Sequence, residues 1–295
     1  MKYYYYPGCT LHSKAVGFDR SGRNCAKAMG IELIDLPDWT CCGTVFPLVM
    51  DNLMSLISPV RNLAKAREGK LDMVILCAFC YNVFKRTNYL VKENPESCKK
   101  INDFLREDIA EPYGGETRAL HLLEVLRDDL GFDRVAGLVK KKIELRLAPY
   151  YGCMLLRPNK EVGLDSADRP TILHDLLTAM GADVVDFAFQ TECCSSYLTV
   201  NSPETTVDCS NSILSSAVGD GADALVVSCP LCFYNLDSRQ KEIKQAHPEF
   251  KSLPIYYFTE LLGIALGLSR EECGLQGHFV DPMPLLEEKE VLRAI

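Results

Sequence analysis

Short apolar runs alternate with segments of helical periodicity along most of this chain. Such runs, bounded by turn residues, are typical of strands buried on both faces of a sheet. They predict strands over residues 2–6, 31–36, 71–76, 145–151, 182–187 and 224–227. The periodic segments predict helices over residues 21–29, 45–66, 81–91, 120–130, 171–180 and 258–268. Strands that alternate with helices in this way indicate parallel α/β units.

Two prolines refine this outline. Pro7-Gly8 ends the first predicted strand and predicts a tight turn at Cys9. Pro59 lies inside the predicted helix 45–66 and is expected to interrupt it, because proline lacks the N–H that the helical ladder needs.

The order of predicted elements occurs twice, and the repeat includes two C-x-x-C motifs. The segment DMVILCAFCYNVF in the first half corresponds to DALVVSCPLCFYNL in the second. An internal duplication explains this correspondence better than two unrelated segments do. We therefore expect an α/β fold with two pseudo-symmetric, doubly wound (Rossmann-like) halves, each with a parallel sheet. The expected domains are residues 1–142, which include a helical linker, and residues 143–295, which include a C-terminal tail.

Ten of the fourteen cysteines take part in the repeat. The first set is Cys9, Cys41, Cys42, Cys77 and Cys80, and the second set is Cys153, Cys193, Cys194, Cys229 and Cys232. In both sets 34 residues separate the adjacent pair from the C-x-x-C motif. Cysteines of the first set follow predicted strand ends, and parallel sheets bind ligands outside the carboxyl ends of their strands. Each set is therefore expected to converge at one edge of one sheet.

Composition narrows the function classes. At 295 residues, the chain is long enough for two domains. With a net charge of −8, it shows no basic stripe of the kind that a nucleic-acid surface needs. The N-terminus MKYYYYPGCT has no apolar signal segment, and the longest apolar run, residues 253–268, is too short and too polar to span a bilayer. A cytoplasmic protein is expected, and clustered cysteines in a reducing compartment are more often metal ligands or redox groups than disulfides.

Three kinds of site could use these cysteines. Structural zinc takes four ligands, often from two C-x-x-C motifs, whereas each set here has five cysteines and one such motif. A cubane iron–sulfur cluster takes four cysteines, often from a compact run, whereas each set here spans more than seventy residues. A dithiol–disulfide relay would use the C-x-x-C motif and leave the other three cysteines of each set unexplained.

The doubled pattern resembles the family of cysteine-rich (CCG) domains. Over nearly its full length the chain is similar to the B subunits of heterodisulfide reductases. The segments KYYYYPGCTLHS, PDWTCCG and PYYGCMLLRP carry this similarity together with the ten spaced cysteines.

The resemblance implies that each set of cysteines binds a non-cubane four-iron cluster, so that the chain would hold two [4Fe–4S] clusters. It also implies that the two clusters face each other and cleave a disulfide between them by two one-electron steps. The implied catalytic positions are Cys9, Cys42, Cys153 and Cys194, with His12 as a candidate proton donor.

Partners follow from the same resemblance. Electrons would arrive from the ferredoxin-like C subunit and the flavin-bearing A subunit of a heterodisulfide reductase-like complex. The acceptor would be a small-molecule disulfide or a partner oxidoreductase. No flavin or nucleotide is expected on this chain, because its glycine clusters at 219–221 and 263–267 match no G-x-G-x-x-G.

Two residues depart from the family pattern. Ser195 follows the second cysteine pair where glycine is expected, which requires a backbone without positive φ. Met154 occupies a position next to a cluster cysteine where methanogen members have histidine, and a thioether cannot donate a proton. A non-catalytic electron relay to a docked enzyme is therefore the alternative to disulfide reduction.

Several residues outside the two cysteine sets have either two possible roles or a structural role. His12 is either a proton donor or a plain hydrogen-bonding residue, and Lys14 and Arg157 either bind an acidic substrate or form ion pairs. Trp39 is expected to pack over the mouth of the first site. The cysteines outside the pattern are expected to be buried small hydrophobes; they are Cys25, Cys98, Cys209 and Cys273.

Two histidines and the C-terminal tail carry no expected chemistry. His121 and His174 are expected to be structural residues in helices. The segment PMPLL, residues 282–286, is expected to dock on a partner or on its own domain.

Overall fold

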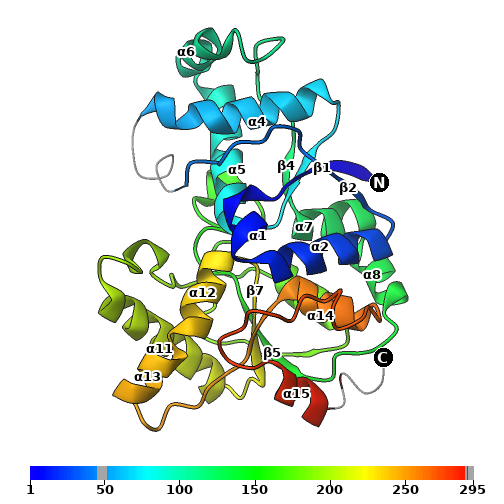
Figure 1. The fold of residues 1–295 in the computed structure, drawn as a ribbon, viewed down its shortest axis with the longest axis vertical. Helices are drawn as coiled ribbons and strands as arrows, with labels where there is room; N and C mark the ends of the chain where they lie inside the picture. The colour runs from blue at the N-terminus through cyan, green and yellow to red at the C-terminus, as the bar shows by residue number, and fades with distance from the viewer. Residues whose placement is uncertain (45–51, 290, 292–295) are drawn as a thin grey trace.

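Two four-stranded parallel sheets, one in each half of the chain, form the framework of the protein (Figure 1). The computed structural model describes residues 1–44, 52–289 and 291. The first sheet contains β1 (Lys2–Tyr6), β2 (Glu32–Asp35), β3 (Met73–Ile75) and β4 (Ala119–His121), and the second contains β5 (Arg146–Tyr150), β6 (Asp183–Val184), β7 (Ala224–Val227) and β8 (Ile255–Tyr257). The α/β fold with two similar halves is therefore confirmed.

Both sheets have the same strand order, β2-β1-β3-β4 and β6-β5-β7-β8, with every neighbouring pair parallel. In each half the chain passes from the first strand to one side and then crosses to the other. This reversal creates a crevice at the carboxyl ends of β1 and β3, and of β5 and β7, where doubly wound sheets bind ligands.

Helices cover the sheets and connect their strands. The first half contains α1 (Gly8–Ser13), α2 (Val16–Ala28), η1 (Leu53–Leu56), α4 (Ile57–Glu68), α5 (Ala78–Glu93), α6 (Pro95–Leu105), α7 (Leu122–Glu124), the π-helical turn η2 (Val125–Leu130) and α8 (Phe132–Leu138). The second contains α9 (Asn159–Val162), α10 (Ile172–Ala179), η3 (Ser196–Leu198), α11 (Pro203–Gly219), α12 (Pro230–Ser238), α13 (Gln240–Ala246), α14 (Phe258–Ala265) and α15 (Met283–Glu288). Within the described residues, no helix has both the length and the apolar character needed to cross a membrane.

Several sequence predictions differ from these elements. Cys9 lies in α1, not in a tight turn, because Gly8 adopts φ +68° and lets a helix start directly after β1. Pro59 does not interrupt α4, because it lies in the first turn, where its missing N–H has no intrahelical partner to lose. The predicted helix 45–66 lies partly outside the described residues, and the strand predicted over 182–187 is only β6.

One edge strand of each sheet, β4 in the first and β8 in the second, was missed. The helix predicted over residues 120–130 begins as β4, and His121 ends that strand instead of lying in a helix. β8 has the corresponding place in the second sheet. Each of these strands has only three residues and runs directly into an apolar helix, so the sequence shows one continuous helical pattern.

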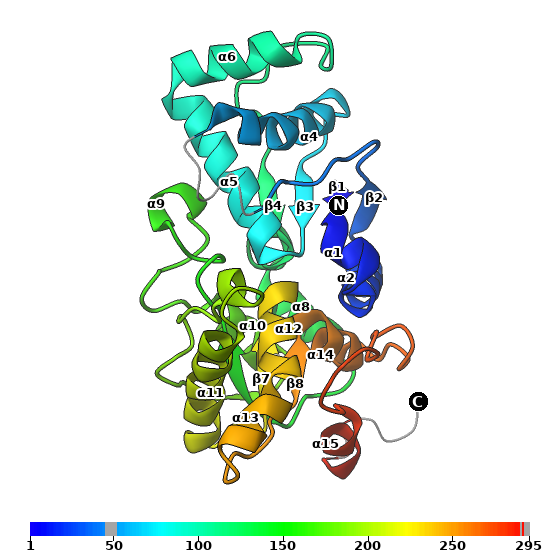
Figure 2. The ribbon, with the colours of Figure 1, turned by 60° about the vertical axis from the view of Figure 1, so that its left-hand side comes forward.

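The two halves pack through helices on either side of a shared interface. In Figures 1 and 2, α2 of the first half lies beside α14 of the second. On the opposite side α10, which follows β5, packs against α8, which follows β4. The two contacts are equivalent, because α2 likewise follows β1 and α14 follows β8. Phe18 on α2 stacks on Tyr257 at 4.0 Å between ring centroids, and Ser21 hydrogen-bonds Thr259 at 2.6 Å.

Gly17 lies where the two halves approach each other closely. A Cβ on this residue would lie 2.2 Å from the carbonyl oxygen of Gly274, and backbone cannot move aside as a flexible side chain can. Gly17→Ala is therefore expected to lower the free energy of unfolding by about 1–3 kcal/mol, the usual range for overpacking. Denaturant unfolding under anaerobic conditions measures this change. Gly137→Ala in α8 is the matched control: its Cβ meets no atom within 4 Å, and its expected effect is a gain of about 0.4–1 kcal/mol. Equal effects of the two variants would contradict the close contact.

Candidate cluster sites

The first set of cysteines converges at the carboxyl edge of the first sheet. Cys9 follows β1 on α1, Cys41 and Cys42 follow β2, and the C-x-x-C motif joins β3 to α5. The Sγ atoms of Cys42 and Cys80 lie 3.3 Å apart, and those of Cys9 and Cys41 lie 4.0 Å apart.

The second set repeats this arrangement pair by pair. Cys194 and Cys232 Sγ lie 3.4 Å apart, and Cys153 and Cys193 Sγ lie 3.6 Å apart. In both sets the pair that includes the C-x-x-C cysteine is buried, and the other pair is more open to solvent. The convergence expected from the strand ends is therefore found in both halves.

Equivalent tyrosines hold the two cysteine pairs against their sheets. Tyr6 donates a hydrogen bond to the carbonyl oxygen of Thr40 at 2.9 Å, and Tyr150 donates to that of Glu192 at 2.6 Å. Each acceptor is the residue directly before an adjacent cysteine pair. The buried Asn62 adds two more bonds to Thr40, because its amide accepts from the backbone N–H and donates to the C=O.

The residue after each pair has a left-handed backbone. Gly43 adopts φ +78° and Ser195 adopts φ +57°, and their N–H groups lie 3.5 Å and 3.3 Å from Cys41 and Cys193 Sγ. The condition under which a serine was expected to be tolerated here, a backbone without positive φ, is therefore not met. Its hydroxyl donates to Cys209 Sγ at 2.9 Å, and this hydrogen bond stabilises a conformation that costs a non-glycine residue about 1–2 kcal/mol.

Two glycines leave room for the sulfurs. Gly8 and Gly152 precede the first cysteine of each set and adopt φ +68° and +62°. A Cβ on either would lie within about a van der Waals contact of a sulfur, 3.2 Å from Cys80 Sγ and 3.4 Å from Cys232 Sγ. Backbone therefore approaches both thiol groups where a side chain would crowd them.

The two sets meet at the centre of the molecule. Cys77 and Cys229 come from opposite halves, and the neighbouring Cys229 thiol is the main cause that lowers the pKa of Cys77 well below its usual value. The buried Asn82 on α5 crosses the same interface and donates hydrogen bonds at 2.7 Å to the carbonyl oxygens of Met154 and Arg157. These hydrogen bonds connect α5, the helix of the first C-x-x-C motif, to the loop that carries Cys153.

Neighbouring thiols lower the pKa of at least one cysteine in each set. The Cys153 thiol lowers the pKa of Cys193 to about 6, and the Cys41 thiol lowers that of Cys42 well below its usual value. Thiolates are the metal-binding form of cysteine.

The donor set suits iron–sulfur chemistry. Five thiols per half match the soft ligands that iron–sulfur clusters and other thiophilic metals take. The sulfurs come together in pairs, and within the described part of the chain no three His, Cys, Asp or Glu side chains surround a point where a single ion would fit. Both sites present closely spaced pairs of thiol sulfurs.

A cavity of about 590 Å³ opens between the halves beside both cysteine sets. Its floor includes Thr10, next to Cys9, and Pro230-Leu231, which lie between Cys229 and Cys232. One wall is the aromatic stack of Phe18, Tyr257 and Phe233, in which Tyr257 and Phe233 lie 4.4 Å apart between centroids. Lys14 contributes a cation to an otherwise largely apolar lining.

Other candidate residues lie around the sites. The exposed His12 ring contacts Trp39, with centroids 6.0 Å apart, and the half-buried Trp39 also contacts Tyr6. Their roles beside the first site stay predictions. Arg157 points to Thr191, where its guanidinium donates at 3.4 Å to the carbonyl and hydroxyl oxygens.

Cysteines outside the pattern differ among themselves. Cys25 and Cys273 are buried, as expected, whereas Cys98 and Cys209 are only partly buried. Cys209 reaches the second set through Ser195, a contact that sequence spacing did not indicate.

Sequence reasoning also missed the asparagines. Asn82 follows Cys80 by two residues and Asn235 follows Cys232 by three. Asn235 donates to the carbonyl oxygen of Cys194 at 3.0 Å. The shared asparagine after each C-x-x-C motif was visible in the aligned segments and is the signal that would have found both.

The fold and the paired cysteine sites define a class, the CCG cysteine-rich domains, and the chain belongs to this family. The family model matches twice, over residues 3–85 and 147–237. The chain is similar over most of its length to the 8-methylmenaquinol:fumarate reductase membrane anchor subunit of Wolinella succinogenes, with 29% identity over 95% of this chain and 98% of that one. It is also similar to the B subunit of the ferredoxin/F420H2-dependent CoB-CoM heterodisulfide reductase of Methanosarcina acetivorans, with 27% identity over 95% and 94%.

A solved structure, that of a hypothetical protein from Helicobacter pylori, has the same fold with a TM-score of 0.74 and 15% identity. The match covers 94% of this chain and 51% of that one, so this chain spans about half of that protein.

Proposed function

We propose that this chain is an iron–sulfur subunit of a heterodisulfide reductase-like complex and that it reduces a disulfide. The observation that carries the proposal is the meeting of two equivalent five-cysteine sets at Cys77 and Cys229, beside a cavity shared by both halves. The similarity to the Methanosarcina acetivorans protein supports the same conclusion.

Each set would hold one four-iron cluster, of the non-cubane kind that the family resemblance implies. The proposed ligands are Cys9, Cys41, Cys42, Cys77 and Cys80 for the first cluster, and Cys153, Cys193, Cys194, Cys229 and Cys232 for the second. When bound, two clusters would supply one electron each. The balance is then one disulfide, two electrons and two protons giving two thiols.

The chain's own residues would bind and orient the disulfide. The aromatic stack of Phe18, Tyr257 and Phe233 excludes water from one side of the cavity, and the Lys14 ammonium attracts an acidic substrate group. His12 remains the proposed proton donor near the first set.

Tyr197 is a further candidate donor, in place of the histidine missing at position 154. Its hydroxyl lies 3.7 Å from Met154 Sδ, and burial raises its pKa to about 12. A hydroxyl donor is therefore present beside the second set, although a thioether occupies the position next to Cys153.

The proposed partners are the electron-delivering subunits, one ferredoxin-like and one flavin-bearing, and the proposed compartment is the cytoplasm. The alternative function is a relay that passes electrons to a docked enzyme. Met154 supports the relay, and so does the similarity to the Wolinella protein, whose name is that of a fumarate reductase component. The proposed domains remain residues 1–142 and 143–295, whose boundary falls between α8 and β5.

Metal analysis of protein purified without oxygen is the first test. About eight irons per chain, the content of two four-iron clusters, are expected. About two zincs with little iron would overturn the redox proposal, because structural zinc takes one ion per site.

Disulfide reduction is tested on the same protein after chemical reduction. Rapid oxidation of the clusters by at least one member of a panel of disulfides with acidic groups is expected. Oxidation by none of the panel, but by a partner enzyme, would favour the relay.

A further inference from the structure

The cavity beside the two cysteine sets has a tyrosine hydroxyl in its wall. Tyr257 lies in this wall, stacked between Phe18 at 4.0 Å and Phe233 at 4.4 Å between ring centroids. Both faces of its ring are covered, and the residue is only 4% exposed. Its O–H has no acceptor among the described residues, although the oxygen is open to solvent. The edge of the ring therefore presents a hydrogen-bond donor to the cavity.

This hydroxyl lies near the centre of the molecule. Burial is the main cause that raises the pKa of Tyr257 well above its usual value, and the nearby Glu260, Cys229 and Cys77 raise it further. Cys77 and Cys229 belong to different sets, so the hydroxyl lies within electrostatic reach of both. A neutral hydroxyl is thus available as a donor between the two sites.

His121 is the equivalent residue of the first half, and both of its ring nitrogens are occupied. Each of the two residues ends an edge strand, β4 or β8, and donates its backbone N–H at 2.8 Å to a glutamate three residues later. Nε2 of His121 lies 2.9 Å from the carbonyl oxygen of Leu76, and Nδ1 accepts a hydrogen bond from the N–H of Leu123. Of this equivalent pair, Tyr257 is the one whose polar group can bind a ligand.

The interface between the halves is open at this cavity and bridged at the equivalent position. Asn82 and Tyr234 both lie two residues after the last cysteine of their C-x-x-C motif. Asn82 spans the interface with two hydrogen bonds to the loop after Cys153. Tyr234 instead is 43% exposed and contacts Phe279, with ring centroids 5.9 Å apart. The space between α12 and the α1–α2 segment therefore stays available to a ligand.

The chain's own tail completes the cavity wall. Phe279 lines the cavity and donates its backbone N–H to Asp237 at 2.6 Å, and Val280 donates to the same carboxylate at 3.3 Å. Further along the tail, the carbonyl oxygen of Pro282 accepts a hydrogen bond from Tyr256. The tail thus docks on its own domain, as one of the two sequence interpretations expected.

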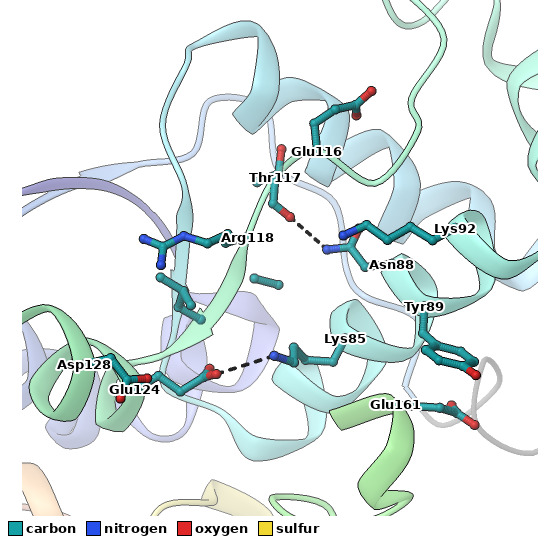
Figure 3. A pocket seen from close by; sticks show the side chains of 12 residues that line it. Lys85, Asn88, Tyr89, Lys92, Glu116, Thr117, Arg118, Glu124, Asp128 and Glu161 are labelled. Carbon is teal, nitrogen blue, oxygen red and sulfur yellow. Dashed lines mark hydrogen bonds and ion pairs between the residues drawn. The ribbon is translucent and has the colours of Figure 1, made fainter. Parts of the chain in front are cut away.

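Charge narrows the kind of ligand. Lys14 is the only charged residue among the described residues that line the cavity, and it has no ion pair among them. A second hollow, of about 390 Å³ beside β4, has four carboxylates and three cations in its lining, and there Lys85 lies 3.4 Å from Glu124 (Figure 3). Charges in that hollow neutralise one another, whereas Lys14 lacks a counter-charge in its cavity. A ligand beside Lys14 is therefore expected to bring one acidic group on an otherwise apolar body.

We propose that this cavity binds a disulfide with an apolar arm and a single acidic group, so that Lys14 pairs with the acid and the Tyr257 hydroxyl donates a hydrogen bond to a sulfur of the disulfide. The inference rests on the proposed disulfide reduction and names the substrate class for that site. The cavity volume of about 590 Å³ lies in the usual range for small-molecule sites.

The hydrogen bond from Tyr257 gains strength during the reaction. A disulfide sulfur acquires negative charge as it is reduced, and hydrogen bonds to ionised acceptors are roughly twice as strong as those between neutral groups. An interaction that is stronger in the transition state than in the bound substrate raises kcat. Loss of the hydroxyl should therefore slow turnover more than it weakens binding.

Binding is tested by calorimetry on the iron-loaded protein without oxygen, with γ-(benzylthio)butyrate as the probe. This thioether has an apolar arm, one sulfur and one carboxylate, and it contains no disulfide to reduce. Tyr257→Phe keeps the aromatic stack and is expected to weaken binding about threefold, and Lys14→Gln about tenfold, the usual effects of one neutral and one charged hydrogen bond. The uncharged amide of the probe is expected to bind Lys14→Gln and the unmodified protein equally.

Two control variants lie away from the cavity lining. Tyr4→Phe removes a hydroxyl that packs against Gly69, and Lys244→Gln removes an exposed cation on α13. Both are expected to bind the probe as the unmodified protein does. Equal affinity of the unmodified protein for the carboxylate and the amide, or effects of the controls as large as those of Lys14→Gln and Tyr257→Phe, would overturn the inference.

Turnover of the mixed disulfide of benzyl thiol and γ-mercaptobutyrate completes the test. Tyr257→Phe is expected to lower kcat about tenfold at unchanged iron content, a larger loss than its effect on the thioether. Lys14→Gln is expected to raise KM about tenfold with little change in kcat. An unchanged kcat in Tyr257→Phe would refute the role of the hydroxyl and leave the proposed function standing. Absence of turnover in the unmodified protein would count against the proposed function instead, because the thioether titrations require no electron transfer.

Discussion

Replacing Cys194 with alanine is expected to halve the iron per chain, from about eight to about four, and to abolish disulfide reduction. Cys194 Sγ lies 3.4 Å from Cys232 Sγ, and the carbonyl oxygen of Cys194 accepts a hydrogen bond from Asn235, so its loss removes a proposed ligand from a buried part of the second set. The first set belongs to the other sheet and is expected to keep its cluster. Iron analysis and electron paramagnetic resonance of the reduced protein measure both effects.

Two further variants define the controls. Cys42→Ala removes the equivalent sulfur, 3.3 Å from Cys80, and is expected to leave the second cluster intact. Cys273→Ala removes a buried cysteine outside both sets and is expected to retain all the iron. Iron loss in Cys273→Ala, or full iron in Cys194→Ala, would contradict the assignment of ligands.

Cysteine spacing predicted the architecture because these cysteines mark the carboxyl ends of strands. The equal interval between each pair and its C-x-x-C motif reflects equal β–α–β connections in the two sheets. The predicted convergence at one edge follows directly from parallel pairing, which brings those ends together. The strands predicted from the sequence and the observed parallel sheets therefore agree on where the cysteines of each set lie.

The periodicity of apolar residues could not identify the short edge strands β4 and β8. In ALHLLEVL the three residues of β4 are followed at once by an apolar helix, and only pairing with β3 distinguishes the strand. The register Met73 to Ala119 is a tertiary contact with no local signal. The same argument applies to β8, whose pairing with β7 is likewise a tertiary contact.

Cysteine spacing likewise does not indicate which residues form the contacts between the halves. The meeting of Cys77 with Cys229 depends on how two separate sheets pack. Ser195 shows a related limit: this serine adopts a positive φ, and Cys209, from another helix, accepts a hydrogen bond from its hydroxyl.

Asn82 is the residue whose loss should most affect the coupling of the two sites. It is buried, and its amide donates to two carbonyl oxygens of the opposite half, those of Met154 and Arg157, each at 2.7 Å. Asn82→Ala leaves both acceptors without this donor and is expected to lower the free energy of unfolding by about 2–6 kcal/mol, since each unsatisfied group costs about 1–3 kcal/mol. Disulfide turnover per iron is expected to fall as well, because the loop of Cys153 loses its tie to α5.

Asn88→Ala separates lost stability from lost coupling. Asn88 lies on the same helix and is also largely buried, but its amide donates to Thr117 within the first half. Its replacement is expected to lower stability while turnover per iron stays at the level of the unmodified protein. Unfolding in denaturant, iron analysis and turnover of all three proteins give the comparison. A similar fall in turnover per iron in both variants would show that Asn82 acts only through general stability, whereas a selective fall would identify it as the residue that positions the second site relative to the first.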